Sequence, residues 1–278
     1  MPAALRHRWL VALALAAHCD APRGAPVANL PSPNAPPASA PIELPRDTQA
    51  PNARSGYFDL DVPGFGAAVV YVPSGAGPRV VVVAAHGNYD RPAWQCHAWH
   101  DLTGERAFVL CPRGVARLDS PSARDVRFTY AAQGAFNREV DASLAALRAR
   151  YGARVAGGPI VYAGFSLGAI FGVGYLRATR ERVAAAALVE GGHTVWSGAA
   201  VRAFADKGGR AVLFGCGQAW CARDARAVAP RFRAAHIETA LGYAPGQGHA
   251  YGGRVADAMR PAFERLIAPA LGVDSAPP

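Results

Sequence analysis

Lysine is almost missing from this chain of 278 residues. Of its 29 basic residues only Lys207 is a lysine, and the others are arginines spread along the sequence without a run. A nucleic-acid surface needs a clustered basic patch, or basic residues interleaved with aromatic ones, and the sequence has neither. The net charge of +9 and the pI near 9.8 therefore do not indicate nucleic-acid binding.

Cofactor and metal motifs are missing as well. The sequence has no glycine-rich phosphate loop and no dinucleotide-binding fingerprint, so we expect no cofactor. Its cysteines and histidines show no CxxC or HxxxH spacing, so we expect no metal site.

A long hydrophobic run is also lacking. The apolar segment 9–17 is too short to span a bilayer, which takes about 20 apolar residues. It follows basic residues at 6–8 and precedes small ones, which is the layout of a cleavable signal peptide over residues 1–19. Cys19 stands where a bacterial lipoprotein is acylated, although His18 precedes it instead of a small residue. We expect an exported protein that is periplasmic, extracellular or tethered to the envelope through Cys19.

Four cysteines remain when Cys19 is set aside: Cys96, Cys111, Cys216 and Cys221. In an oxidising compartment an even number favours disulfides, and four cysteines allow three pairings. The most economical pairing joins Cys96 to Cys111 and Cys216 to Cys221. Four buried thiols are the alternative.

The chain divides by composition into a linker, a domain and a tail. Residues 20–54 are rich in proline, alanine and asparagine and poor in core-forming residues, which predicts an extended linker. Residues 55–273 have the pattern of one folded domain, and 274–278 form a short tail.

Within the domain, strand and helix patterns alternate. Segments 56–62 and 67–73 alternate apolar with polar or small residues and predict an antiparallel pair of strands. Helical patterns are expected from Asn137 onward and from Val255 to Ile267. The alternation predicts an α/β fold with a mostly parallel twisted sheet and helices on both faces. The segments that read as strands buried on both faces of this sheet are 79–87, 107–112, 159–166, 182–190 and 210–217.

The segment GFSLG at residues 164–168 matches G-x-S-x-G and stands between a predicted strand and a predicted helix. That context is the one a nucleophile elbow requires. At such a sharp turn the serine backbone is strained, and a Cβ at either flanking glycine position would collide with its neighbours. We therefore predict that Ser166 is a nucleophile at the carboxyl edge of the sheet. An inert serine in a tight turn is the alternative.

A serine nucleophile needs a base and a site for the developing oxyanion. His249 lies in a glycine-rich loop after the last predicted strand, 236–243, and we predict that it is the base. The turn after segment 79–87 is expected to supply one backbone oxyanion donor, from Asn88 or Tyr89, and Leu167 the other. His86 also lies at the end of a predicted strand, and we expect it to be a structural hydrogen-bonding residue beneath the site.

Three segments now carry a resemblance: HG after a buried strand, GFSLG in mid-chain and GHAYGG near the end. They resemble the α/β-hydrolase superfamily in its compact dienelactone-hydrolase-like or esterase-like branch, over residues 56–273. The resemblance implies attack on an ester, thioester or amide carbonyl of a small acyl compound. It also implies a covalent acyl-serine that water releases.

The acid of the triad departs from that family's pattern. The family's acid usually follows the strand before the last, where this chain has Gln218, Ala219 and Trp220 and reaches Asp224 only later. Glu190, at the end of the preceding strand, is the other candidate. We favour Glu190 because two glycines follow it at a strand end, whereas an acidic residue at the start of a helix, as expected for Asp224, suits the helix dipole.

The site should be open. About 20 residues separate Glu190 from Arg210, too few for an inserted cap domain, which needs roughly 40 or more. The loop 113–134 is the longest of the domain. Together with that loop, the tryptophans are candidates to line the site: Trp94, Trp99, Trp196 and Trp220.

The function that we expect is a serine hydrolase acting on small esters or related acyl compounds. A serine peptidase for short peptides shares the same chemistry. A non-catalytic binding or envelope module that kept the fold is the alternative from another class, because a fold alone does not establish function. The sequence names neither the substrate-binding residues nor the oligomeric state.

Overall fold

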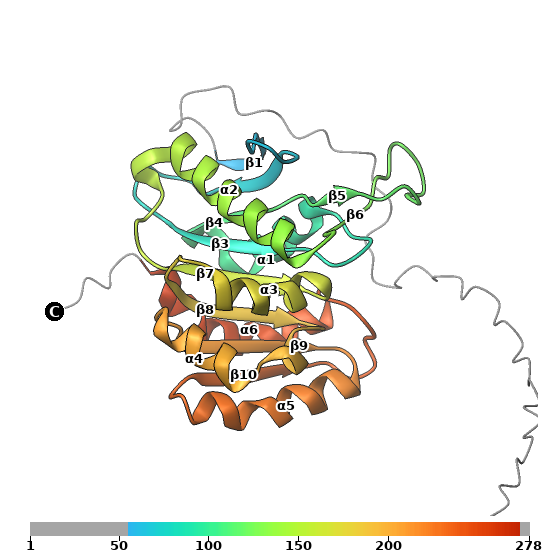
Figure 1. Cartoon of the computed structure of the whole chain (residues 1–278), viewed down its shortest axis with the longest axis vertical. Coiled ribbons are helices and arrows are strands. Elements are labelled where there is room, and N and C mark those ends of the chain that lie inside the picture. The colour runs from blue at the N-terminus through green and yellow to red at the C-terminus, as the bar shows by residue number, and fades with distance from the viewer. Residues whose placement is uncertain (1–54, 273–278) are drawn as a thin grey trace, which may run out of the picture. The chain divides into compact units, whose positions relative to one another are not determined.

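The computed structural model describes residues 55–272, and the predicted signal peptide, Cys19, the linker and the tail lie outside those residues. The described chain builds an eight-stranded sheet in the order β1-β2-β4-β3-β7-β8-β9-β10 (Figure 1). The pairs β1-β2 and β2-β4 are antiparallel, and the other neighbouring pairs are parallel. The strands are β1 Gly56–Leu60, β2 Ala68–Val72, β3 Val80–Ala85, β4 Ala107–Cys111, β7 Ile160–Phe165, β8 Val183–Val189, β9 Ala211–Cys216 and β10 Glu238–Tyr243.

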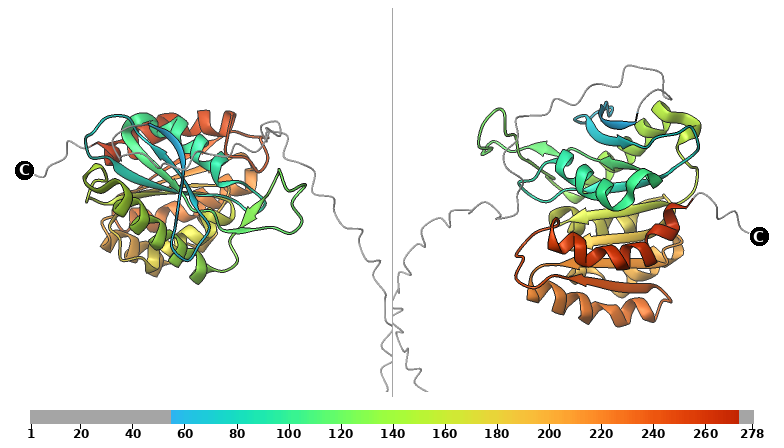
Figure 2. Two further views of the ribbon diagram at one scale, coloured as in Figure 1. Left: turned by 90° about the horizontal axis from the view of Figure 1, so that it is seen from above. Right: turned by 180° about the vertical axis from the view of Figure 1, so that it is seen from behind.

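Helices cover both faces of the sheet, as the alternating pattern predicted. Helices α2, α3, α4 and α5 lie on one face, and α1 and α6 lie on the other, where the view from behind shows them (Figures 1 and 2). The α-helices are α1 Pro92–Thr103, α2 Gln133–Tyr151, α3 Leu167–Ala178, α4 Gly198–Asp206, α5 Ala219–Arg233 and α6 Arg254–Leu266. Within the described residues, four short 3-10 helices accompany them: η1 Gly104–Arg106, η2 Gly152–Arg154, η3 His193–Val195 and η4 Ala268–Leu271.

The central strands are buried on both sides, which explains their continuous apolar runs. In β3, Val81 and Val83 pack into the core beneath α2 to α5, while Val82 and Ala84 pack into the core beneath α1 and α6. Because successive side chains of a strand point to opposite faces, a strand between two helical layers needs apolar residues at every position.

Two helices begin earlier than the sequence signals indicate. Helix α2 starts at Gln133, not at Asn137, whose side-chain oxygen accepts a hydrogen bond of 2.8 Å from the Gln133 amide. Helix α5 starts at Ala219, so Asp224 lies inside the helix and does not begin it. The loop 113–134 contains a short antiparallel hairpin made of β5 (Val115–Ala116) and β6 (Phe128–Thr129).

The four described cysteines form two disulfides in the most economical pairing. Cys96 is joined to Cys111, with Cα atoms 5.9 Å apart, and Cys216 to Cys221, with Cα atoms 5.7 Å apart. The first disulfide links α1 to the end of β4. The second closes a small loop between the end of β9 and the first turn of α5.

Two of the four tryptophans proposed for the site belong to the core instead. Trp99 and Trp196 are buried, and Trp196 packs against Phe204 and Phe232. Within residues 55–272, the chain between β8 and β9 holds only η3 and α4, so no cap domain is inserted there. No helix in the described part of the chain is long and apolar enough to cross a membrane.

Candidate active site

Ser166 occupies a strained turn between β7 and α3. Its φ of 52° lies in the left-handed region that non-glycine residues seldom adopt. The flanking glycines are needed for space: a Cβ at Gly164 would lie 2.8 Å from the carbonyl carbon of Gly168, and a Cβ at Gly168 would lie 2.4 Å from the Ala85 oxygen. The turn therefore has the geometry of a nucleophile elbow.

His249 reaches Ser166 from the loop between β10 and α6. Its Nε2 atom lies 2.8 Å from the Ser166 Oγ atom, across 83 positions of sequence. The imidazole packs against Phe165, with ring centroids 4.8 Å apart. The His249 side chain is 43% exposed, so the site is open to solvent as expected.

Glu190 stands at the end of β8, beside the elbow. In the sheet Phe165 pairs with Val189 and Val189 with Gly215, so the residues that follow these strands emerge side by side. The Glu190 carboxylate is buried, and its Oε2 atom lies 3.5 Å from Nδ1 of His249. The structure thus brings Ser166, His249 and Glu190 together in one row.

The two oxygens of Glu190 have different surroundings. Oε1 accepts hydrogen bonds from the backbone N–H groups of Gly217, a short contact, and of Gln218, at 3.0 Å. Oε2 is buried and has no hydrogen-bond partner among the described residues. An acceptor left free beside Nδ1 favours the tautomer with a proton on Nδ1, which leaves Nε2 free to accept the hydroxyl proton of Ser166.

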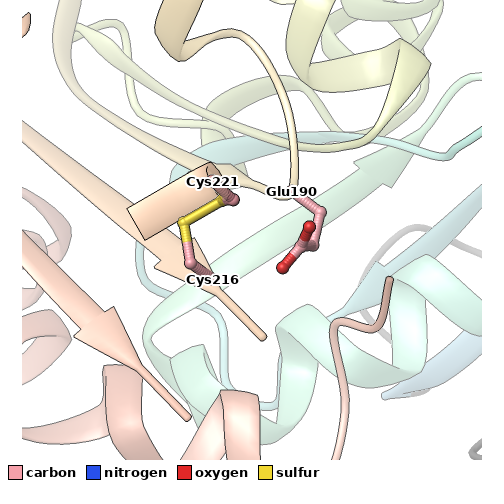
Figure 3. Close-up of side chains that lie close together, drawn as sticks. All are labelled: Glu190, Cys216 and Cys221. Carbon is pink, nitrogen blue, oxygen red and sulfur yellow. A yellow bond between two sulfur atoms is a disulfide. The ribbon is translucent and has the colours of Figure 1, made fainter. Parts of the chain in front are cut away.

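The loop after β9 holds a disulfide where the family's acid usually stands. Figure 3 shows the Cys216–Cys221 disulfide beside the Glu190 carboxyl group. Because these sulfurs are bonded to each other, they offer no thiolate to a metal, and this cluster does not fit a metal site.

Asp224 is not brought to His249. It pairs with Arg223, at 2.8 Å, and lies 3.8 Å from Nε2 of the buried His193. Burial lowers the pKa of His193, and the Asp224 charge opposes that shift.

The backbone around the elbow separates the two candidates for the first oxyanion donor. The N–H of Tyr89 donates to the Phe128 carbonyl at 3.0 Å. The N–H of Asn88 has no such acceptor among the described residues, and its side-chain oxygen accepts from Arg117 at 2.8 Å. The loop lies against the serine, because a Cβ at the preceding Gly87 would be 3.2 Å from the Ser166 Cβ. Leu167, the other candidate donor, is the first residue of α3, where N–H groups lack helical partners.

His86 has the structural surroundings that the sequence suggested. Its ring is buried and stacks on Tyr130, with centroids 4.4 Å apart. Nδ1 lies 2.7 Å from the Gly87 carbonyl oxygen, and Nε2 lies 2.8 Å from that of Arg113. The ring therefore ties the loop after β3 to the loop after β4.

A second buried carboxylate, Asp90, was missed by the sequence reasoning. Its Oδ2 accepts from the Gly87 N–H at 3.3 Å and from the Gln95 amide at 3.1 Å. Its Oδ1 accepts from the Arg91 N–H at 2.8 Å and from the Tyr251 hydroxyl at 3.4 Å. Burial raises the pKa of Asp90, although the nearby His86 and the donors from Arg91, Gly87 and Gln95 oppose that shift.

Asp90 thereby joins the loop after β3 to the loop that carries His249. Tyr251 follows His249 by two residues, and its ring packs on Phe165 with centroids 4.6 Å apart. The sequence signal for Asp90 was only an acidic residue shortly before a helix, which reads as a helix-dipole partner. Its partner Tyr251 is 161 positions away, so spacing could not reveal the pair.

The sequence matches no protein-family model and no curated protein. Solved structures share its fold. The esterase PE8 aligns with a TM-score of 0.55 and 16% identity over 75% of this chain and 100% of its own. TT1662 from Thermus thermophilus aligns with a TM-score of 0.54 and 18% identity over 77% of this chain and 98% of its own.

A third similar structure is the dienelactone hydrolase-like promiscuous phosphotriesterase P91 from metagenomic libraries. It aligns with a TM-score of 0.52 and 17% identity over 77% of this chain and 98% of its own. With the strand order described above, these similarities show that the chain has the α/β-hydrolase fold, as its resemblance implied.

Proposed function

We propose that this protein is a serine hydrolase that cleaves small esters or related acyl compounds. The observation that carries the proposal is the 2.8 Å contact between Ser166 Oγ and His249 Nε2, made on a strained strand-to-helix turn. The α/β-hydrolase fold supports it, and so do the names of similar structures, which include an esterase and a dienelactone hydrolase-like phosphotriesterase.

In the first half-reaction, Nε2 of His249 takes the hydroxyl proton as Ser166 Oγ bonds to the acyl carbon. The carbonyl oxygen becomes an oxyanion, which the N–H groups of Asn88 and Leu167 stabilise. The bond to the leaving group then breaks, and Nε2–H protonates the leaving oxygen. Removal of one such oxyanion donor typically costs about 3 kcal/mol of transition-state stabilisation.

In the second half-reaction, water replaces the leaving group. Nε2 takes a proton from the water as its oxygen bonds to the acyl carbon, and the bond from that carbon to Ser166 Oγ then breaks. The proton returns to the serine oxygen, so the enzyme is unchanged. Glu190 stabilises the imidazolium of His249 in both steps by accepting from Nδ1–H.

The test is covalent labelling with a fluorophosphonate probe, combined with hydrolysis of p-nitrophenyl acetate. We expect the native protein to be labelled and active. We expect Ser166→Ala and His249→Ala to abolish labelling and to lower turnover by about 10³-fold or more. The matched control is Ser55→Ala, because Ser55 is an exposed serine at the start of the described residues.

An unlabelled native protein would favour the non-catalytic reading of the fold. Labelling of Ser166→Ala at the native rate would show that another residue reacts, and would also defeat the proposal. If the protein cleaves short peptides with a higher kcat/KM than p-nitrophenyl acetate, it is a peptidase and the ester assignment is wrong.

We also propose that the protein is exported. The signal-like sequence of residues 1–19 supports this proposal, and so do the two disulfides, since disulfides persist in oxidising compartments. Cell fractionation with mass spectrometry of the mature N-terminus tests it. A mature protein that begins at an acylated Cys19 would establish the envelope tether, and a cytosolic protein that retains residues 1–19 would contradict export.

A further inference from the structure

The exposed large hydrophobic side chains gather at one edge of the sheet. Among residues 55–272 there are five of them, and each follows the carboxyl end of a strand, on the side of Ser166. They are Val115, Leu118, Ile170, Val195 and Trp220. Single exposed hydrophobic residues are normal on a protein surface, but their confinement to one edge points to a contact made there.

Three of these side chains form what we call the apolar strip: Ile170, Val195 and Trp220, which are 41%, 44% and 43% exposed. Ile170 lies one helical turn after Ser166, and its N–H donates to the Ser166 carbonyl at 3.0 Å. Val195 ends η3, after β8, and Trp220 lies in the first turn of α5, after β9.

The three residues follow one another across the edge of the sheet. β7, β8 and β9 are neighbours in that order, α3 contacts η3, and η3 contacts α5. Neighbouring strands are about 4.8 Å apart, so the ends of β7, β8 and β9 that precede these residues span about 10 Å. That length suits an extended chain rather than a single methyl group.

The strip is also fixed and uncharged. The indole N–H of Trp220 donates to the Gln218 side-chain oxygen, and its ring lies 5.5 Å from the buried ring of His193. The polar edge of the indole is therefore satisfied within the protein, and its apolar surface remains exposed. Nearby charged groups have partners of their own: Arg223 pairs with Asp224 at 2.8 Å, and Arg231 donates to the Trp196 carbonyl at 2.7 Å.

We propose that the apolar strip binds an uncharged, extended acyl or alkyl chain of the ester that Ser166 attacks. The proposal rests on the proposed function and adds a substrate class to it: esters with medium-length apolar chains. The occupant is a substrate chain because the strip begins one turn from the nucleophile and continues away from it through uncharged side chains. Burial of apolar surface in proportion to chain length supplies the preference.

The experiment compares kcat/KM for p-nitrophenyl octanoate and p-nitrophenyl acetate, both below the concentration at which the longer ester aggregates. We expect the native protein to prefer octanoate by about tenfold or more. Trp220→Ala should lower kcat/KM for octanoate by about tenfold and leave acetate within about twofold. Trp220→Phe, which keeps an aromatic ring, should restore most of the loss.

Arg233→Ala is the matched control, because Arg233 is exposed in the last turn of α5, the helix whose first turn holds Trp220. We expect this control variant to leave kcat/KM unchanged for both esters. Melting temperature and the rate of fluorophosphonate labelling, measured for each variant, separate a local effect from a loss of folding.

Several results would overturn the proposal. If the native protein is labelled and cleaves the acetate ester but has no higher kcat/KM for the octanoate ester, the proposal about the strip is wrong and the hydrolase proposal stands. An equal loss for both esters in Trp220→Ala, or the same loss in Arg233→Ala, would show that the strip has no specific role. If the native protein is neither labelled nor active, the hydrolase proposal is wrong, and so is the proposal about the strip.

Discussion

Two buried carboxyl groups contact the loop that carries His249, and they are bound in different ways. Asp90 receives donors on both oxygens: the Gly87 N–H and Gln95 on one, the Arg91 N–H and Tyr251 on the other. Glu190 receives its two backbone donors on Oε1 alone, and Oε2 faces the ring of His249.

The comparison teaches that burial does not decide what a carboxylate does. A group with both oxygens occupied can hold segments in place but has no lone pair left for a base that changes its charge. A group held through one oxygen is fixed in position and still has an acceptor to offer. We therefore propose that Glu190 orients His249 and that Asp90 holds the two loops together.

Glu190→Gln should have the largest effect on this comparison. The amide keeps the size of the side chain but cannot stabilise an imidazolium as a carboxylate does. We expect kcat for p-nitrophenyl acetate to fall by about 10³-fold or more, with the melting temperature nearly unchanged. A loss of less than about tenfold would mean that another group orients His249.

Asp90→Asn should have an intermediate effect and a different character. One side-chain oxygen becomes an N–H₂ group, so two of the four donors lose their acceptor. An unsatisfied buried donor costs about 1–3 kcal/mol of stability, which thermal or denaturant unfolding will measure. We expect kcat to fall about tenfold, because Gly87 and Tyr251 both adjoin the site. Unchanged stability with a loss as large as that of Glu190→Gln would reverse our two assignments.

Removal of the two disulfides should have smaller effects, with one disulfide mattering more for stability and the other more for kcat. The chain-entropy relation gives about 3 kcal/mol for a 15-residue loop and about 2 kcal/mol for a loop of 5 residues, which match Cys96–Cys111 and Cys216–Cys221. Replacing the first pair by serines should therefore lower stability more. Replacing the second pair should lower kcat more, by about threefold to tenfold, because its loop supplies the N–H donors to Glu190.

Unfolding curves and steady-state kinetics on the two double variants test whether one loses more stability and the other more kcat. If the Cys216→Ser, Cys221→Ser protein keeps full activity, the disulfide does not help to position the acid. Prolonged reduction of the variant that lacks Cys96 and Cys111 gives an independent measurement of the same point.

Asp224→Asn should have the smallest effect. The side chain pairs with Arg223 near the surface, and surface ion pairs contribute about 0–1 kcal/mol. We expect kcat within about twofold of the native value. A loss comparable to that of Glu190→Gln would return the role of the acid to Asp224.

Much of the fold could be predicted from local patterns. The buried runs placed the parallel strands of the sheet, and the alternating segments before residue 74 placed the antiparallel pair. The elbow was evident because a strand, a G-x-S-x-G turn and a helix follow one another directly in the sequence. The most economical disulfide pairing is the one that the structure has.

What depended on contacts across the sheet could not be predicted in the same way. The choice between Glu190 and Asp224 rests on which strand end emerges beside Phe165, and on the donors that the chain supplies 27 and 28 residues later. Periodicity also could not tell that Trp196 is a core residue or that α2 begins at Gln133, since tertiary packing overrides weak start signals.

The glycines around Ser166 leave almost no freedom for change at the centre of the site. A Cβ at Gly191 would lie 2.5 Å from the backbone carbonyl oxygen of Ser166, and one at Gly87 would lie 2.8 Å from the ring of Phe165. A side chain at either position would displace the backbone that shapes the turn, so we expect substrate preference to be altered by side chains further from Ser166. Trp220 and the other exposed residues of the apolar strip are the positions where we expect such changes to be tolerated.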